Sequence, residues 1–238
     1  MRGEDVKIQW MYLGLFALLF WRPCAAGDDS PFLPSLYTVR IVTPNGSWGH
    51  GVRLDDHRIL TAAHVVDEEA DGASFKAFDL HGREIGIATI AKIGSRRRPD
   101  LALLTYGFDP TQMPWLRLRD HIRICEQDAA PGEKLGVAFG NVFHSTHASF
   151  DFVTMSQQQA TSTATEAFFS RGVSGAGVYS TERSCLTGIV SQRETWEINS
   201  AGCLADAIGT KPRLEGCGVL IGTKYVVAAE IRAFLSRQ

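Results

Sequence analysis

Residues 170–177 read Ser-Arg-Gly-Val-Ser-Gly-Ala-Gly and lead into an apolar run that begins at Val178. Because glycine lacks a Cβ and readily takes positive φ, the backbone here can turn tightly and point its N–H groups in one direction. Two converging N–H groups beside a serine oxygen are what acyl transfer needs to stabilise an oxyanion. A glycine-rich turn with a capping serine is the alternative interpretation. Ser174 is a nucleophile only if the rest of the chain supplies a base and an acid.

A histidine and an aspartate stand at the ends of two apolar runs upstream. Residues 59–66 read Ile-Leu-Thr-Ala-Ala-His-Val-Val, which places His64 after an expected strand, among small residues. Asp100 follows Pro99 and precedes the apolar run Leu101–Leu104, where a carboxylate can be partly buried. Taken singly, each could be an ordinary turn residue. A triad acid holds the tautomer of the imidazole and stabilises the imidazolium, so the two positions together suit a base and its orienting acid.

The order of these residues excludes the α/β-hydrolase fold, and the β-rich pattern disfavours the subtilisin fold. All seven histidines precede Ser174, whereas an α/β-hydrolase has its histidine after the serine. Its Gly-x-Ser-x-Gly elbow also fails, because Ala176 stands at the last position. The subtilisin order would require Asp55 or Asp56 as the acid, and the β-rich pattern disfavours that fold. The seven histidines are His50, His57, His64, His81, His121, His144 and His147.

Short β-branched and apolar runs separated by turns predict an antiparallel sandwich or barrel. The expected strands of a first unit are Tyr37–Thr43, Gly51–Leu54, Ile59–Ala62, Phe75–Leu80, Ile85–Ile93 and Leu101–Tyr106. Those of a second unit are Leu135–Phe139, Phe150–Met155, Gly177–Ser180, Leu186–Ser191 and Gly218–Thr223. Residues 107–132 read as a linker, and Tyr225–Leu235 has the near-helical spacing of a terminal helix.

Three motifs together resemble those of the trypsin-like (chymotrypsin-fold) serine proteases, namely Thr61–His64, Asp100–Leu103 and Gly172–Gly177. Gly188–Ser191 resembles the strand with which this family binds the substrate backbone. Gly132–Asn141 is similar to the opening of the second barrel in bacterial members. The resemblance runs from Tyr37 to the C-terminus and is to a secreted bacterial type without a PDZ domain.

The resemblance implies an all-β fold of two antiparallel six-stranded β-barrels of chymotrypsin type with a C-terminal helix. The first barrel would span about 37–118, the second about 131–224, and the terminal helix 225–236. A cleft between the barrels would hold the site.

The same resemblance implies a serine endopeptidase that works through an acyl-enzyme. Ser174 would be the nucleophile, His64 the base and Asp100 the orienting acid, with the N–H groups of Gly172 and Ser174 as oxyanion hole. This chemistry needs no metal and no organic cofactor. A catalytically idle homologue that binds protein in the cleft, and an esterase using the same triad, are the alternative functions.

Four residues are expected to bind substrate, and three of them, Phe168, Gln192 and Arg193, depart from common family patterns. Phe168, at the base of the primary specificity pocket, favours a small or apolar residue before the scissile bond. Ser191 would also form a hydrogen bond near Asp100. Gln192 and Arg193 follow it where many members have an aromatic residue and glycine.

The maturation of the chain is expected to differ from that of digestive proteases. Val173 occupies the position at which zymogen-activated members carry an aspartate, so a freed amino terminus would find no ion-pair partner. Arg40-Ile41-Val42 resembles an activation site but lies within the first expected strand. We therefore expect that removal of a signal peptide alone matures the enzyme.

The N-terminus predicts export. Arg2 and Lys7 precede the apolar run Trp10–Trp21, and small residues follow up to Ala26, as in a signal peptide over 1–26 and a leader over 27–36. A signal anchor and a lipoprotein modified at Cys24 are the less favoured alternatives. The expected location is secreted or periplasmic, with no stable membrane span after cleavage.

The net charge indicates which classes of partner suit the chain, and the cysteines indicate whether it forms disulfides. A net charge of −2 excludes a polyelectrolyte-type nucleic-acid binder, so the expected partners are protein or peptide substrates and, as regulator, a protein inhibitor. Signal cleavage would leave four cysteines, which suits disulfides in an exported protein and allows three pairings. Cys203 with Cys217 is the first interpretation, with Cys125 and Cys185 remaining. His144 and His147 read as part of a polar loop.

Overall fold

The computed structural model describes residues 33–67, 72–94, 99–107, 121–149, 164–165, 167, 169, 172–197 and 218–237. Side chains are described over the same ranges, except in part of β9, of β11 after Ser191, of β12 before Thr223 and at the end of β8.

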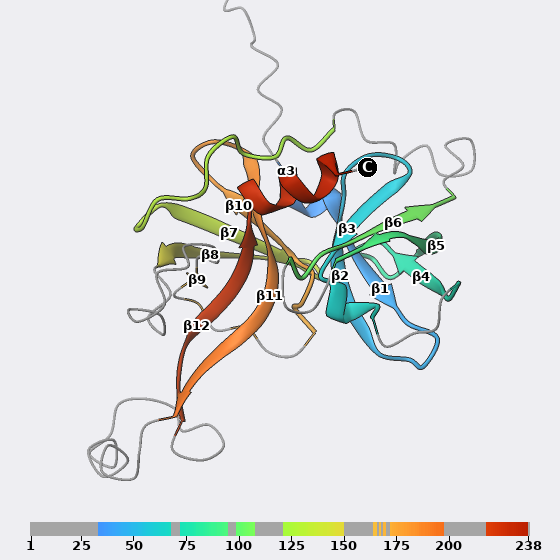
Figure 1. The fold of residues 1–238 in the computed structure, drawn as a ribbon, viewed down its shortest axis with the longest axis horizontal. Helices are drawn as coiled ribbons and strands as arrows, with labels where there is room; N and C mark the ends of the chain where they lie inside the picture. Colours follow the sequence, from blue (N-terminus) through green and yellow to red (C-terminus); the bar gives the residue numbers. More distant parts are fainter. Residues whose placement is uncertain are drawn as a thin grey trace, which may run out of the picture. The chain divides into compact units, whose positions relative to one another are not determined.

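The first barrel consists of short antiparallel strands in the closed order β1-β2-β3-β6-β5-β4 (Figure 1). These are β1 (Thr38–Val42), β2 (Trp48–Arg53), β3 (Arg58–Thr61), β4 (Ser74–Phe78), β5 (Glu84–Ile93) and β6 (Ala102–Tyr106). Alternate residues of β4 face inward, as the period of two along a strand requires: Phe75 and Ala77 are fully buried. They pack with Ile41, Ile59 and Leu104 in the barrel core.

The second barrel closes in the order β10-β11-β12-β9-β8-β7. Its strands are β7 (Lys134–Phe139), β8 (Val142–Ser149), β9 (Ala164–Thr165), β10 (Gly177–Ser180), β11 (Cys185–Glu197) and β12 (Gly218–Val227). Leu135, Val137, Val178, Val190 and Tyr225 belong to its core. Strands β11 and β12 continue as a paired hairpin beyond the barrel (Figure 1). The predicted architecture of two six-stranded barrels with a C-terminal helix is confirmed.

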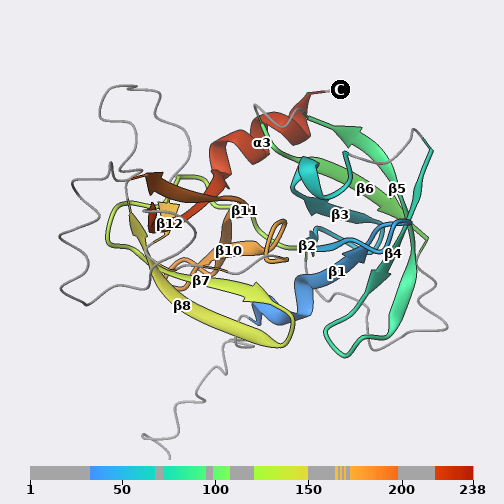
Figure 2. The ribbon, with the colours of Figure 1, turned by 90° about the horizontal axis from the view of Figure 1, so that it is seen from below.

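Helix α3 (Ala228–Ser236) connects elements from both halves of the fold (Figure 2). At its start, Ala229 N donates to Asp128 Oδ1 at 2.9 Å, ahead of the second barrel. At its end, Lys92 of β5 donates to the carbonyls of Phe234 and Arg237. Cations near a helix C-terminus offset its partial negative charge, so the Lys92 contact favours this position of the helix against the first barrel.

The helix begins three residues later than the predicted Tyr225. Tyr225, Val226 and Val227 extend β12 and pair with Val190, Ile189 and Gly188. Because β-branched residues fit a pleated sheet better than a helix, the Val-Val pair prolongs the strand until the alanines begin.

The interpretation of residues around His144 and His147 as a polar loop is wrong. They lie in β8, which pairs with β7 from Lys134↔His147 to Phe139↔Val142. Of the side chains that face inward, Thr146 and Ala148 are small, so the segment shows no apolar alternation in the sequence. The expected strand Phe150–Met155 lies outside the described residues.

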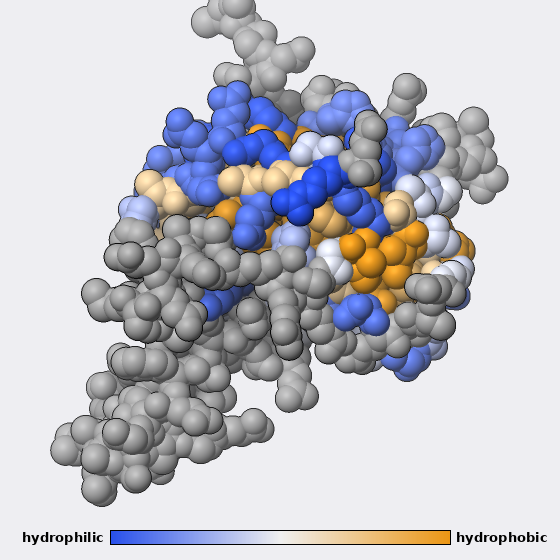
Figure 3. Space-filling model, viewed as in Figure 1, coloured by the Kyte–Doolittle hydropathy of each residue, from blue (hydrophilic) through white to orange (hydrophobic). Residues whose placement is uncertain are grey.

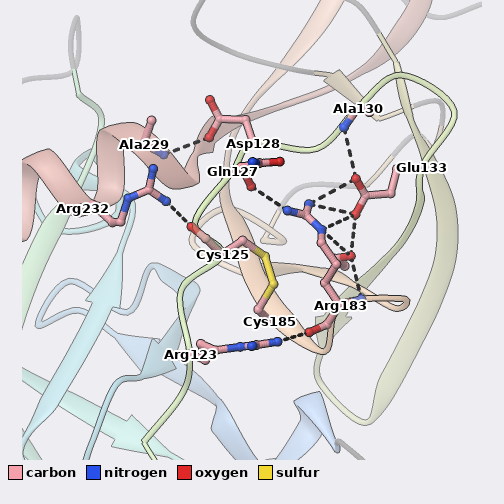
Figure 4. Close-up of a disulfide and its surroundings, with 11 residues drawn as sticks. Arg123, Cys125, Gln127, Asp128, Ala130, Glu133, Arg183, Cys185, Ala229 and Arg232 are labelled. Carbon is pink, nitrogen blue, oxygen red and sulfur yellow. Dashed lines mark hydrogen bonds and ion pairs between the residues drawn. A yellow bond between two sulfur atoms is a disulfide. The ribbon is translucent and has the colours of Figure 1, made fainter.

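Part of the expected linker is tied to the second barrel by a disulfide. Cys125 is bonded to Cys185 at the start of β11 (Figure 4). Beside it, Cys125 N donates to Leu186 O, and Leu186 N donates to Arg123 O. These two bonds form a short parallel bridge. Cys203 and Cys217, the pair favoured from the sequence, lie outside the described residues.

In the face shown in Figure 3, many of the coloured residues are hydrophilic, and a large apolar area lies over the first barrel. Among the described residues, no helix has the length and apolar character that crossing a bilayer requires.

Acid is expected to weaken the fold partly through Glu133. Burial raises the pKa of this carboxyl, but hydrogen bonds from Ser180, Arg183 and Ala130 outweigh it, so the pKa lies below its ordinary 4.5 (Figure 4). A depressed pKa adds stability that is present above the unfolded value and lost as pH falls through the folded value. Thermal unfolding between about pH 5 and about pH 3 should therefore show a smaller loss of stability for Glu133→Gln than for wild type.

Glu84→Gln is the matched control, because Glu84 faces Lys76 at 3.4 Å on the exposed surface. Its stability should follow the wild-type pH dependence. An unchanged pH dependence in Glu133→Gln would contradict the assignment.

Candidate active site

His64 and Asp100 meet where two strands of the first barrel end or begin. Strand β3 ends at Thr61, and the turn η2 (Ala63–Val65) that follows carries His64. His64 Nδ1 lies 2.7 Å from Asp100 Oδ2, and the backbone N–H of His64 donates to Asp100 Oδ1 at 3.0 Å. Two bonds to one carboxylate fix both the backbone and the ring of the histidine. The fully buried Ala62 and Ala63 leave room for this close approach.

Asp100 is held as a carboxylate by a third donor. Ser191 Oγ, from β11 of the second barrel, donates to Asp100 Oδ2 at 2.5 Å. Burial opposes ionisation and raises the pKa of Asp100, but the hydrogen bonds from His64 and Ser191 outweigh it and leave the pKa below its ordinary value. An ionised Asp100 accepts a hydrogen bond from Nδ1–H of His64, so Nε2 carries no proton and can accept one.

The serine turn, residues 172–177, is a tight turn with two glycines at positive φ, Gly172 at 93° and Gly175 at 83°. Gly175 N donates to Val190 O at 2.8 Å, and Ala176 N donates to Val173 O at 3.0 Å. Ser174 O accepts from the backbone N–H of His50 in β2 at 2.8 Å. The turn is therefore anchored to both barrels.

Gly49 of β2 brings the serine turn and the histidine turn together. A Cβ on Gly49 would lie 2.8 Å from Val65, the neighbour of His64, and 3.1 Å from Ser174 O. Only a residue without a side chain permits this spacing. The neighbour of His64 and the carbonyl of Ser174 thus both lie close to the Cα of Gly49.

The N–H groups of Gly172 and Ser174 are the donors predicted for the oxyanion hole. In the part of the chain that the structure describes, neither Gly172 N nor Ser174 N donates to another backbone carbonyl. Such donors, at a turn of fixed geometry, suit an oxyanion.

The model of the trypsin-like peptidase domain matches residues 49–189, more than half of the chain. The chain belongs to the trypsin-like peptidases. No curated protein matches its sequence.

Solved trypsin-like structures share the fold at low identity. Kallikrein-related peptidase 10 has a TM-score of 0.55 at 16% identity, with 84% of this chain and 93% of that chain covered. The Rv3671c protease of M. tuberculosis H37Rv in its inactive form has 0.54 at 17%, covering 85% and 89%. A serine protease of a human pathogenic astrovirus has 0.51 at 16%, covering 82% and 90%. These likenesses extend across both barrels.

Val173, the residue before Ser174, is 4% exposed and packs in the second core. Ile41 is fully buried and pairs with Gly49 on one side and Ala77 on the other. A cut after Arg40 would divide a central strand of the barrel. The placement of Arg40-Ile41 within the first strand is confirmed.

The predicted substrate-binding residues are only partly within the described structure. The side chain of Ser191 turns to Asp100, so this residue supports the site. Gln192 and Arg193 lie in β11, where their backbones pair with Lys224 and Thr223. Phe168 and the side chains of Gln192 and Arg193 lie outside the described residues. Within the described residues, no cluster of three His, Cys, Asp or Glu side chains is placed to hold a metal ion.

Two residues at this site were not singled out from the sequence. His50 Nδ1 lies 2.7 Å from Gly172 O, and the ring of Trp48 occupies the space that a Cβ on Gly172 would need. His50 and Gly172 are 122 residues apart in the sequence, and no local pattern predicts that they will pair. The Gly-His-Gly sequence of residues 49–51 was the available signal.

Gly175→Ala is expected to destabilise the fold by about 3 kcal/mol, because the methyl adds overpacking to the strain of positive φ. The new Cβ would lie 2.0 Å from His50 O and 2.4 Å from Thr61 Oγ1. Urea unfolding measures the change.

Gly82→Ala is the matched control, since Gly82 also has positive φ (77°) but no atom within 4 Å of the Cβ position. It should lose only about 1 kcal/mol, the cost of the backbone conformation. Equal losses in the two variants would show that packing against β2 contributes nothing.

Proposed function

We propose that this chain is a serine endopeptidase in which Ser174, His64 and Asp100 form the catalytic triad. The observation that carries the proposal is the Asp100 carboxylate, which binds both the ring and the backbone of His64 beside the serine turn. An acid that fixes the tautomer of a histidine next to a serine is the arrangement that acyl transfer requires.

In the proposed reaction His64 Nε2 takes the proton of Ser174 Oγ as this oxygen attacks the carbonyl carbon of a peptide. The carbonyl oxygen becomes an oxyanion and accepts hydrogen bonds from Gly172 N and Ser174 N. The C–N bond then breaks, and His64 gives its proton to the leaving amine. A water molecule, deprotonated by His64, hydrolyses the acyl-enzyme and regenerates Ser174.

For substrate recognition we propose that residues 188–191 of β11 bind the peptide backbone. Phe168 at the pocket base would favour a small or apolar residue before the scissile bond, with Gln192 and Arg193 at the pocket mouth. Cleavage of a peptide library by the mature protein reads this preference directly.

We further propose export, with removal of residues 1–26 as the maturation step. The Cys125–Cys185 disulfide supports an oxidising compartment. Mass spectrometry of the protein recovered from outside the cytoplasm should give a chain beginning at Gly27.

The test of the proposed function is labelling with a serine-directed fluorophosphonate. Wild type should be modified at Ser174, and Ser174→Ala should remain unlabelled. A folded wild type that takes no label would show a catalytically idle homologue. A labelled protein that cleaves esters but no member of a peptide library would be an esterase.

A further inference from the structure

His50 is a buried histidine that the proposed mechanism does not use. It lies in β2, is 4% exposed, and its ring packs edge-on against Trp48 and Phe139, with centroids 5.7 and 6.2 Å away. Phe139 belongs to the second barrel, so the ring sits between elements of both barrels.

All four polar groups of His50 are bonded. Its backbone N–H donates to Ser174 O at 2.8 Å, and its carbonyl accepts from Thr61 Oγ1 at 2.6 Å. On the ring, Nδ1 lies 2.7 Å from Gly172 O, and Nε2 accepts from Gly140 N at 3.0 Å. Gly140 forms the turn between β7 and β8. One residue therefore binds the carbonyls of both proposed oxyanion donors.

These partners define the protonation of the ring. A carbonyl only accepts and a backbone amide only donates, so the proton is on Nδ1 and Nε2 is bare. Burial lowers the pKa of His50, the Gly172 hydrogen bond opposes that effect, and Arg40 on β1 lowers the pKa further. Arg40 pairs with His50 across the two strands and is the charged group that acts on the ring among the described residues.

We infer that His50 is a positioning residue for the oxyanion hole, whose neutral imidazole links the Gly172 carbonyl to the β7–β8 turn. The inference rests on the proposed function for its catalytic consequence. Such a link is useful at Gly172, because glycine has more allowed backbone conformations than any other residue and its own side chain cannot hold φ at 93°. Its neighbour Val173 contributes apolar packing and no side-chain hydrogen bond. Holding Gly172 O limits the directions in which Gly172 N can point.

The link has a built-in response to acid. Protonation of His50 would set an Nε2–H against the Gly140 N–H, and the bond to the β7–β8 turn would be lost. Since the pKa of His50 is lowered, the link persists below the ordinary value of 6.5 and opens only as the pH falls further.

Three substitutions of His50 in the mature chain separate the two ring contacts. His50→Phe keeps a ring between Trp48 and Phe139 but removes both hydrogen bonds. His50→Asn retains a donor near the Nδ1 position, and His50→Gln retains an acceptor near the Nε2 position. His57→Asn is the control for the loss of a histidine, because His57 is exposed and its backbone, rather than its ring, binds Asp55 and Tyr106.

The measurements are kcat, KM and the rate of fluorophosphonate labelling, each per titrated active site. His50→Phe should lower kcat and the labelling rate about 10²-fold with little change in KM, since misplacement of a donor acts on the transition state. His50→Asn should recover most of this loss. His57→Asn should match wild type.

A structural role alone would lower the melting temperature of His50→Phe while kcat per active site stayed at the wild-type value, and that result overturns the inference. An Asn variant as slow as the Phe variant overturns the assignment to Gly172 O. If His50→Phe does not fold, the comparison of Asn with Gln decides, with Asn expected to be faster.

Nuclear magnetic resonance keeps this inference separate from the proposed function. The ¹⁵N spectrum of wild type should show His50 protonated on Nδ1 alone at neutral pH, and hydrogen exchange of the Gly172 amide should be faster in His50→Phe. An imidazolium at neutral pH, or unchanged exchange, overturns the link. A wild type that takes no fluorophosphonate refutes only the proposed function.

Discussion

Asp100→Asn is expected to lower kcat about 10⁴-fold, the effect that this exchange has in a Ser-His-Asp triad. Asp100 accepts hydrogen bonds from His64 N, His64 Nδ1 and Ser191 Oγ. An asparagine must point its NH₂ at one of these donors. The relief of that clash favours the His64 tautomer with its proton on Nε2, which cannot accept a proton from Ser174.

Steady-state kinetics on a cleaved peptide, corrected for folded protein by circular dichroism, measures this loss. Asp79→Asn is the matched control: Asp79 is also buried and accepts from Arg83 and His81, but in a turn of the first barrel away from the serine turn. Its kcat should stay near wild type, whatever its stability. An Asp100→Asn enzyme within tenfold of wild type would refute the triad.

Loss of the Cys125–Cys185 disulfide is expected to destabilise the protein by about 4 kcal/mol, the loop-closure entropy for a loop of this length. The bond closes a separation of 60 residues. It also fixes the segment where Arg232 of α3 donates to Cys125 O, so the helix and the second barrel share this anchor (Figure 4). Among the described residues no other disulfide closes a loop.

The double variant Cys125→Ala with Cys185→Ala tests this without leaving an unpaired thiol. Urea unfolding should show the loss, and the melting temperature should fall by roughly 10 °C, at roughly 2–4 °C per kcal/mol for a chain of this size. Arg232→Ala, which removes only the hydrogen bond to Cys125 O, should cost about 1 kcal/mol. A double variant that loses no more than Arg232→Ala would contradict the expected contribution of the disulfide.

Much of the fold could be predicted from local sequence, because buried and exposed side chains alternate along a strand and this alternation can be read from the sequence. Phe75 and Ala77 are buried on either side of the exposed Lys76, and the turn at Asp79–Gly82 closes as expected, with Gly82 N donating to Asp79 O. Strand β8 was not predicted from the sequence, because its inward-facing residues are small and most of its outward-facing residues are polar. The helix start was placed too early because Val226 and Val227 satisfy a helical spacing as well as a strand.

The partners of each site residue could be predicted only in part. The residues Ser174, His64 and Asp100 were selected from three separate motifs, and the structure brings His64 and Asp100 into contact. Four cysteines allow three pairings, and Cys203 with Cys217 was favoured because it would close a glycine-rich loop; spacing did not indicate that Cys125 would lie beside Cys185. His50 was not selected, although residues 49–51 read Gly-His-Gly, because this local pattern does not show which residues the ring will contact.

The sequence alone determined the chemistry available to this protein: a serine in a glycine-rich turn, a histidine and an aspartate at strand ends, and a chain order that matches one fold. The tertiary structure decided the contacts between barrels, including Ser191 on Asp100 and His50 on Gly172 and Gly140. The physical reason is the distance along the sequence between the residues that interact. Turn geometry and strand period depend on adjacent residues, whereas a hydrogen bond across 122 residues exists only after both barrels have closed. The serine turn could be predicted from residues 170–177, but the contacts that hold its N–H groups in place could not.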